Sequence, residues 1–175
     1  MEIYQGARHS AEHPGAPRGR SKADFGYAWD AWKKGYRMGV ISSSDHYSTH
    51  ISYGMVYARA NTREAVFDAI RQRRTYGATD NILLEFRLGD HFMGEDFATR
   101  ARDPIRVKYR GTGAVASVQL IRDGKYIHQF SPNKQEGDLE FEDLDPSLGQ
   151  HWYYVRLEQQ DGQLAWSSPI WVRYQ

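Results

Sequence analysis

The chain has 175 residues, of which 40% are hydrophobic and 26% charged, a composition typical of a folded globular protein. Its 23 basic and 22 acidic residues give a formal charge of +1, so bulk charge gives no support for nucleic-acid binding. The absence of cysteine excludes disulfides, cysteine-ligated zinc and a thiol nucleophile. No apolar run reaches the roughly 18 residues of a membrane span, and no secretory signal begins the chain. We therefore expect a soluble protein without a membrane partner, in a compartment that the sequence leaves open.

Residues 1–80 have the pattern of a mixed α/β unit, in which strands and helices alternate. The second helix begins near Asn61, and Glu64 lies three residues on, as in a capping box. The expected elements are a strand at 2–4, a long polar loop over 5–23, a helix over 24–36, a buried strand over 38–42 and a helix over 61–74.

From residue 81 onward the apolar period changes to two, which is typical of strands with one buried face. Asp123-Gly124 and Asp161-Gly162 each separate two such stretches and predict hairpin turns. About seven short strands indicate an immunoglobulin-like or fibronectin-like antiparallel sandwich. The expected fold is therefore α+β, with an α/β domain over 1–80 and a β-sandwich domain over 81–175.

The densest group of chemically capable residues follows the predicted strand over 38–42. Asp45, His46 and His50 offer a hard carboxylate oxygen and two imidazoles, which suit zinc, manganese or iron. Such a cation lowers the pKa of bound water and polarises a phosphoryl oxygen. The alternative interpretation is that Asp45 caps a loop and both histidines are ordinary surface residues.

A second candidate site lies in the polar loop over 5–23. Arg8, His9 and His13 could bind a phosphate or sulfate group, because arginine pairs well with such anions. The alternative is a solvated basic loop, and the residues themselves leave both interpretations open.

The segment from Met38 to His46, which ends in Ser-Ser-Ser-Asp-His, resembles the last third of PHP-type (polymerase and histidinol phosphatase) metal-dependent phosphoesterases. The run Arg74-Thr75-Tyr76-Gly77-Ala78-Thr79 is similar to the segment that closes many PHP-like barrels. The stretches 89–94 and 165–171 resemble the β-rich tail of large bacterial PHP-like hydrolases.

This resemblance implies that residues 1–80 are the terminal βα units of a PHP-type barrel, followed by a sandwich tail. It implies a divalent metal held by Asp45 and hydrolysis of a small-molecule or phosphoester substrate. The family's Asp-x-His becomes Asp-His-Tyr here, and no His-x-His occurs. We therefore expect the C-terminal fragment of a hydrolase, inactive in isolation, whose α/β part packs on the sandwich, pairs with a second copy or is partly disordered. The alternative function is a non-catalytic β-sandwich module for binding or structure.

Overall fold

The computed structural model describes residues 1–6, 9–20, 26–46, 50–144 and 146–175. Strands make up 50% of the described residues and helices 9%. The strands, in chain order, are β1 (Glu2–Gln5), β2 (His9–Ser10), β3 (Ile41–Ser43), β4 (Tyr53–Val56), β5 (Thr75–Ala78), β6 (Leu83–Leu88), β7 (His91–Phe92), β8 (Asp96–Thr99), β9 (Ile105–Arg122), β10 (Lys125–Phe130), β11 (Lys134–Phe141), β12 (Gly149–Gln159), β13 (Leu164–Ser167) and β14 (Ile170–Tyr174). The helices are α1 (Ala28–Lys33) and α2 (Arg63–Arg71). The fold is thus nearly all β, and the expected α+β class is wrong.

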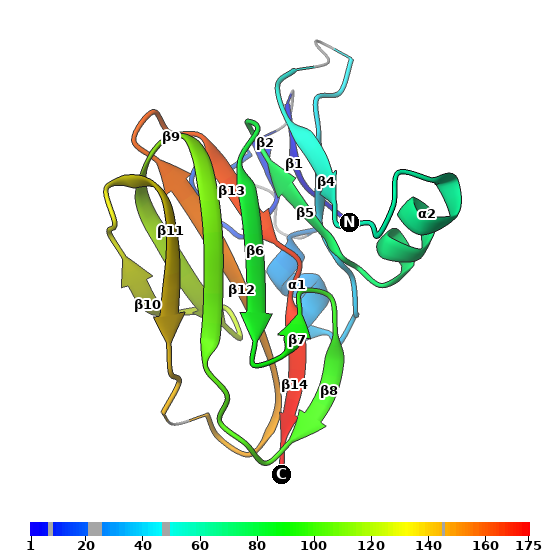
Figure 1. The fold of residues 1–175 in the computed structure, drawn as a ribbon, viewed down its shortest axis with the longest axis vertical. Coiled ribbons are helices and arrows are strands. Elements are labelled where there is room, and N and C mark those ends of the chain that lie inside the picture. Colours follow the sequence, from blue (N-terminus) through cyan, green and yellow to red (C-terminus); the bar gives the residue numbers. More distant parts are fainter. Residues whose placement is uncertain (7–8, 21–25, 47–49, 145) are drawn as a thin grey trace.

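The long strand β9 organises a β-sandwich (Figure 1). Its first half pairs with β6 and β11, and its second half pairs with β12 and β10. The hydrogen-bonded path runs β4-β5-β13-β12-β9-β6-β7. Phe86 of β6, Val107 of β9 and Val155 of β12 belong to one buried apolar cluster. Because the two halves of β9 contribute to different sheets that share this core, the single hydrogen-bonded path folds over on itself.

The period-two pattern explains the orientation of the strand residues. In the first half of β9, the apolar side chains are buried and the alternating arginine and lysine side chains are exposed. The turn between β9 and β10 confirms the predicted hairpin, since Asp123 and Gly124 have positive φ values of 53° and 77°. Alternation and turn chemistry thus specify this part of the sandwich directly.

The N-terminal segment forms a further layer on the outer face of the sandwich. β1 pairs with β3 in parallel and with β2 in antiparallel, and α1 lies between β1 and β3 in the chain. Trp32 of α1 and Ile3 of β1 pack against Trp152, Tyr154 and Trp166 of β12 and β13. Of the three expected outcomes for this segment, the structure shows packing on the sandwich. Pairing with a second copy stays a prediction.

The segment expected to close a barrel instead belongs to the sandwich. β4 and β5 pair in antiparallel, and Ala78 of β5 pairs with Ala165 of β13. The helix between β4 and β5 is the one expected over 61–74, although its N-cap is Thr62. The expected terminal βα units of a PHP-type barrel are therefore wrong, because β5 extends an antiparallel sheet. A domain boundary at residue 80 stays a prediction.

Among the described residues, no helix has the length and apolar character needed to cross a membrane.

Candidate functional site

The strand-end cluster forms a surface turn after β3. Asp45 has a positive φ of 61°, a conformation that aspartate tolerates better than most residues. Its Oδ1 lies 2.9 Å from Nδ1 of His46, and the two side chains are 11% and 83% exposed. His50 is also exposed, and residues 47–49 lie outside the described part of the chain. The structure thus places the side chains of Asp45 and His46, which are adjacent in the sequence, in direct contact.

Nowhere in the described ranges do three or more histidine, aspartate or glutamate residues form a group that could hold a metal ion. Structural and catalytic metal sites usually need at least three protein ligands in a defined geometry. The ligand roles of Asp45, His46 and His50, and the zinc, manganese or iron ion assigned to them, stay predictions.

The predicted anion site in the N-terminal loop is described only in part. Arg8 lies outside the described residues. His9 is exposed, with its ring edge-on to Tyr4 at 6.4 Å. His13 is buried and stacks on Trp29 with ring centroids 4.0 Å apart. The anion-binding roles of Arg8, His9 and His13 stay predictions.

The ring nitrogens of His13 both have partners. Nδ1 lies 2.8 Å from the carbonyl oxygen of Pro14, and Nε2 lies 2.7 Å from the hydroxyl of Tyr126. Since a carbonyl only accepts, Nδ1 carries a proton, and a neutral ring accepts the Tyr126 hydroxyl at Nε2. In this arrangement His13 joins the N-terminal loop to β10.

A buried carboxylate next to His13 is the centre of a larger polar network, which the sequence interpretation missed. Glu12 is fully buried, and its Oε2 accepts hydrogen bonds from Arg156 at 2.8 Å and from the Trp166 indole at 2.9 Å. Its Oε1 accepts the hydroxyl of Tyr154, which in turn accepts the indole N–H of Trp29 at 2.7 Å. The network therefore fastens the N-terminal loop to β12 and β13.

The electrostatics of this network favour a fixed ion pair. Burial opposes the charge on Arg156, but the adjacent Glu12 outweighs that effect and raises the pKa of the guanidinium. Burial and the same carboxylate raise the pKa of the Tyr154 hydroxyl well above its ordinary value. The phenol thus stays a hydrogen-bond donor. A signal existed in the sequence, since Arg156 interrupts the apolar run from Trp152 to Leu157.

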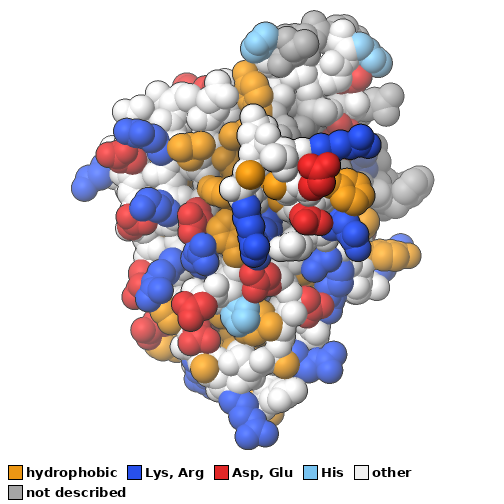
Figure 2. All heavy atoms as spheres, turned by 45° about the vertical axis from the view of Figure 1, so that its right-hand side comes forward, with side chains coloured by type: hydrophobic (Ala, Val, Ile, Leu, Met, Phe, Trp, Pro, Cys, Tyr) orange, Lys and Arg blue, Asp and Glu red, His pale blue; other side chains and the backbone are white. Residues whose placement is uncertain are grey.

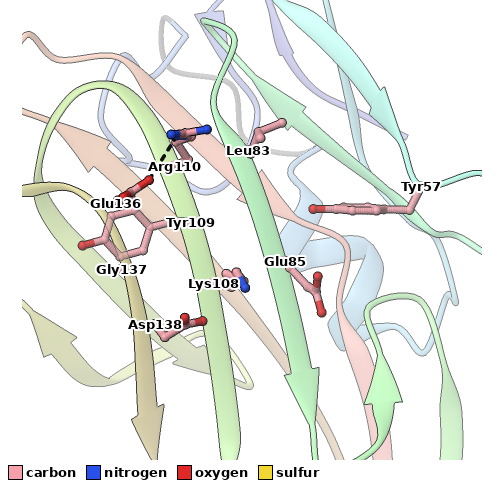
Figure 3. Close-up of a pocket in the computed structure, with 9 residues that line it drawn as sticks. All are labelled: Tyr57, Leu83, Glu85, Lys108, Tyr109, Arg110, Glu136, Gly137 and Asp138. Atoms are coloured by element: carbon pink, nitrogen blue, oxygen red, sulfur yellow. Dashed lines mark ion pairs between the residues drawn. The ribbon is translucent and has the colours of Figure 1, made fainter.

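An open trough of about 550 Å³ lies over the outer face of β6, β9 and β11 (Figure 3). Strand register arranges the outward side chains in three rows. These rows are Leu83–Arg110–Glu136, Glu85–Lys108–Asp138 and Arg87–Arg106–Glu140. The trough covers the first two rows, and its far wall includes Tyr57, whose hydroxyl donates to the carbonyl oxygen of Leu84 at 3.0 Å.

Acidic and basic side chains are interspersed on this face, and one pair of like charges, Arg87 and Arg106, lies directly opposite each other. Arg110 lies 3.1 Å from Glu136, and Arg106 lies 2.9 Å from Glu140. Burial raises the pKa of Tyr57, so its phenol is neutral and acts as a donor. Figure 2 shows the same interspersed charge over the neighbouring side of the molecule, without a large field of one sign. The arrangement provides fixed hydrogen-bond donors and acceptors on a rigid sheet, which suits recognition.

Fold and site together define a β-sandwich module with an N-terminal layer fastened to one face and a charged trough on the other sheet. Residues 14–117 match the family described as "Protein of unknown function (DUF3604)". This match covers more than half of the chain, and the chain belongs to that family.

Three chlamydial proteins, all described as uncharacterized, are similar over 129 residues. The proteins of Chlamydia muridarum, Chlamydia trachomatis and Chlamydia pneumoniae are 29%, 30% and 31% identical, respectively. Each alignment covers 63% of this chain and 21% of the relative. The chain therefore spans about a fifth of the length of these relatives.

Two solved structures are similar in part. The fibronectin(III)-like modules of Clostridium thermocellum CbhA give a TM-score of 0.36 at 10% identity, covering 53% of this chain and 96% of that one. A lytic polysaccharide monooxygenase of Jonesia denitrificans gives a TM-score of 0.36 at 13% identity, covering 73% and 79%.

The resemblance to PHP-type phosphoesterases is wrong. The matched family has no assigned function, and the segment from Arg74 to Thr79 supplies a strand of an antiparallel sheet. The interpretation as a PHP-type hydrolase is wrong with it, since that interpretation depended on barrel units, and the described residues form an antiparallel sandwich in their place.

Proposed function

We propose that the chain is a non-catalytic β-sandwich module with a binding or structural role in a longer polypeptide. The observation that carries this proposal is the charged outer face of β6, β9 and β11. Its side chains are held in register by a rigid sheet, and three ion pairs, Glu85–Arg87, Arg106–Glu140 and Arg110–Glu136, satisfy charges on the same face. Such a surface supplies recognition without a group prepared for proton transfer or nucleophilic attack.

The buried polar groups support the same conclusion. Glu12 and Arg156 are almost fully buried and bind each other and neighbouring side chains, so they stabilise the layers and are closed to a substrate. The length of the chlamydial relatives supports a role as one part of a larger protein.

Turnover of generic phosphoesters tests the non-catalytic role. The purified chain is incubated with p-nitrophenyl phosphate and bis(p-nitrophenyl) phosphate, with zinc, manganese or iron added in turn. We expect hydrolysis at the rate of the metal-containing buffer, with no difference between the wild-type chain and Asp45→Ala. Metal-dependent hydrolysis that is lost in Asp45→Ala but retained in the matched control Lys108→Ala would overturn the proposal.

A further inference from the structure

β11 lies at an open edge of the sandwich (Figure 1). In the described structure it pairs with β9 along one side and with no strand along the other. None of its eight residues is buried. In an antiparallel ladder, alternate residues point their backbone N–H and C=O groups away from the existing neighbour, so this edge offers a row of backbone groups to an incoming strand.

The apolar core is incompletely covered along this edge. Leu139 and Phe141 of β11 and Ile127 and Phe130 of β10 pack on the core but remain partly exposed. Together with His128, whose ring centroid lies 4.5 Å from those of Phe130 and Phe141, these four side chains form a largely apolar seam between the open edges of the two sheets. A strand added beside β11 would place every second side chain over the seam.

A buried hydroxyl points to the same edge. Tyr109 is 3% exposed, and its hydroxyl has no hydrogen-bond partner among the described residues. The ring passes over Gly137 of β11, where a Cβ would lie 2.8 Å from the hydroxyl oxygen. Figure 3 shows the hydroxyl directed across β11, away from β9. Burial raises the pKa of this phenol, so it is a donor that needs an acceptor.

The outward side chains of β11 determine which charge a strand added beside β11 would need. Glu136, Asp138 and Glu140 each lie opposite a base on β9, and two of the three form ion pairs with it. A second β11 strand would bring like charges together, which disfavours self-association through this edge. The complementary strand carries lysine or arginine at alternate positions, as β9 does on the other side.

We propose that the open edge of β11 binds an extended partner segment in which basic residues alternate with apolar ones. The basic side chains face Glu136, Asp138 and Glu140, the apolar side chains cover the seam, and a backbone carbonyl of the segment accepts the hydroxyl of Tyr109. This is β-strand addition, in which main-chain bonds supply affinity and alternate side chains supply specificity. The inference rests on the proposed binding role and names the class of partner.

The test uses a capped synthetic peptide, Ile-Arg-Val-Lys-Tyr-Arg, which copies the chain's own basic strand. Amide shifts of the isotopically labelled chain are followed by NMR during titration. We expect the shifts to concentrate on β11 and Tyr109, and the binding to weaken with added salt. A peptide of reversed charge, Ile-Glu-Val-Glu-Tyr-Glu, is called here the reversed peptide. At low salt its affinity should be at least about tenfold lower than that of the basic peptide.

Tyr109→Phe removes the unpartnered hydroxyl without changing the ring, so it should leave the stability of the free chain unchanged or slightly higher. It should weaken the basic peptide about two- to tenfold. Glu64→Gln on α2 is the matched control and should bind like the wild type. Equal binding of the basic and reversed peptides, no binding of either, or full affinity in Tyr109→Phe would overturn the inference. None of those results depends on the phosphoester assay, so the two proposals fail separately.

Discussion

Replacing Glu12 with glutamine keeps the size of the side chain and removes its negative charge. In the folded chain this carboxylate accepts hydrogen bonds from Arg156, Tyr154 and Trp166. The amide can still accept some of these bonds, but its NH₂ group then faces donors, and the guanidinium of Arg156 is left charged and nearly buried. The perturbation therefore acts on the contact between the N-terminal layer and the sandwich.

The expected loss is large, because breaking a buried ion pair on one side costs about 3–5 kcal/mol. That is a substantial fraction of the roughly 5–15 kcal/mol that stabilises a typical domain. Urea unfolding followed by tryptophan fluorescence measures it, since Trp32, Trp152 and Trp166 lie in the cluster between the layers. The control is Glu136→Gln, which removes an ion pair whose side chains are 67% and 66% exposed and should cost less than about 1 kcal/mol.

A double variant separates the pair from the packing around it. Glu12→Leu combined with Arg156→Met replaces both charges with apolar groups, and such replacements are often neutral or stabilising. We expect it to recover only part of the stability lost in Glu12→Gln, because the Tyr154 hydroxyl and the Trp166 indole still lose their acceptor. If Glu12→Gln costs no more than the surface control, or if the double variant is as unstable as the single one, the reasoning about this network is refuted.

Three further changes test other parts of the fold. Burial raises the pKa of Tyr76 from 10.0 to about 12, so between these pH values the phenol is ionised only in the unfolded chain. Stability should therefore fall as pH rises through this window, and urea unfolding of Tyr76→Phe should show an alkaline loss smaller by up to about 3 kcal/mol. Gly94 has φ of +93° and packs against the backbone of Arg73, so Gly94→Ala should cost about 3 kcal/mol in thermal unfolding. Thr62 accepts the backbone N–H of Ala65 at 3.2 Å, and Thr62→Ala should destabilise α2 by about 1 kcal/mol, seen as faster amide exchange in its first turn.

The sequence predicts local structure well where one residue pattern decides it. The alternation over 105–110 predicts the first half of β9, and Asp123-Gly124 predicts the turn to β10. The helical period over 61–74 predicts α2, although the capping residue is one position later than expected. In each case the deciding contacts lie within a few residues, so short-range propensity and the tertiary fold agree.

The pairing of distant strands could not be predicted in the same way. β5 is only four residues long and buried throughout, so its sequence does not distinguish a parallel strand of a barrel from an antiparallel one. β9 continues through Gly111 and Gly113, which would ordinarily indicate a break. A Cβ at Gly111 would clash with the side chain of Gln159, so this glycine lets β12 approach where β9 changes partners.

The candidate sites show the same division. Asp45 and His46 attract attention because they are adjacent and chemically capable, yet their neighbourhood in the fold is a surface turn. Glu12 and Arg156 are 144 residues apart, and only folding brings them together. The open edge of β11 likewise depends on which strands pair, because an alternating charged strand has the same sequence pattern at an edge or in the middle of a sheet.

β12 explains why the layers depend on one another. Tyr153 and Val155 face the core between the two sheets, whereas Trp152 and Tyr154 face the N-terminal layer. A strand buried on both faces needs cover on both, because an exposed cluster of large aromatic side chains favours aggregation. The N-terminal layer supplies that cover, and the ion pair between Glu12 and Arg156 fixes its position. Both faces of β12 are therefore covered, whereas in the described structure β11 has a strand partner along one edge only. The proposed additional strand would bind along the other edge of β11.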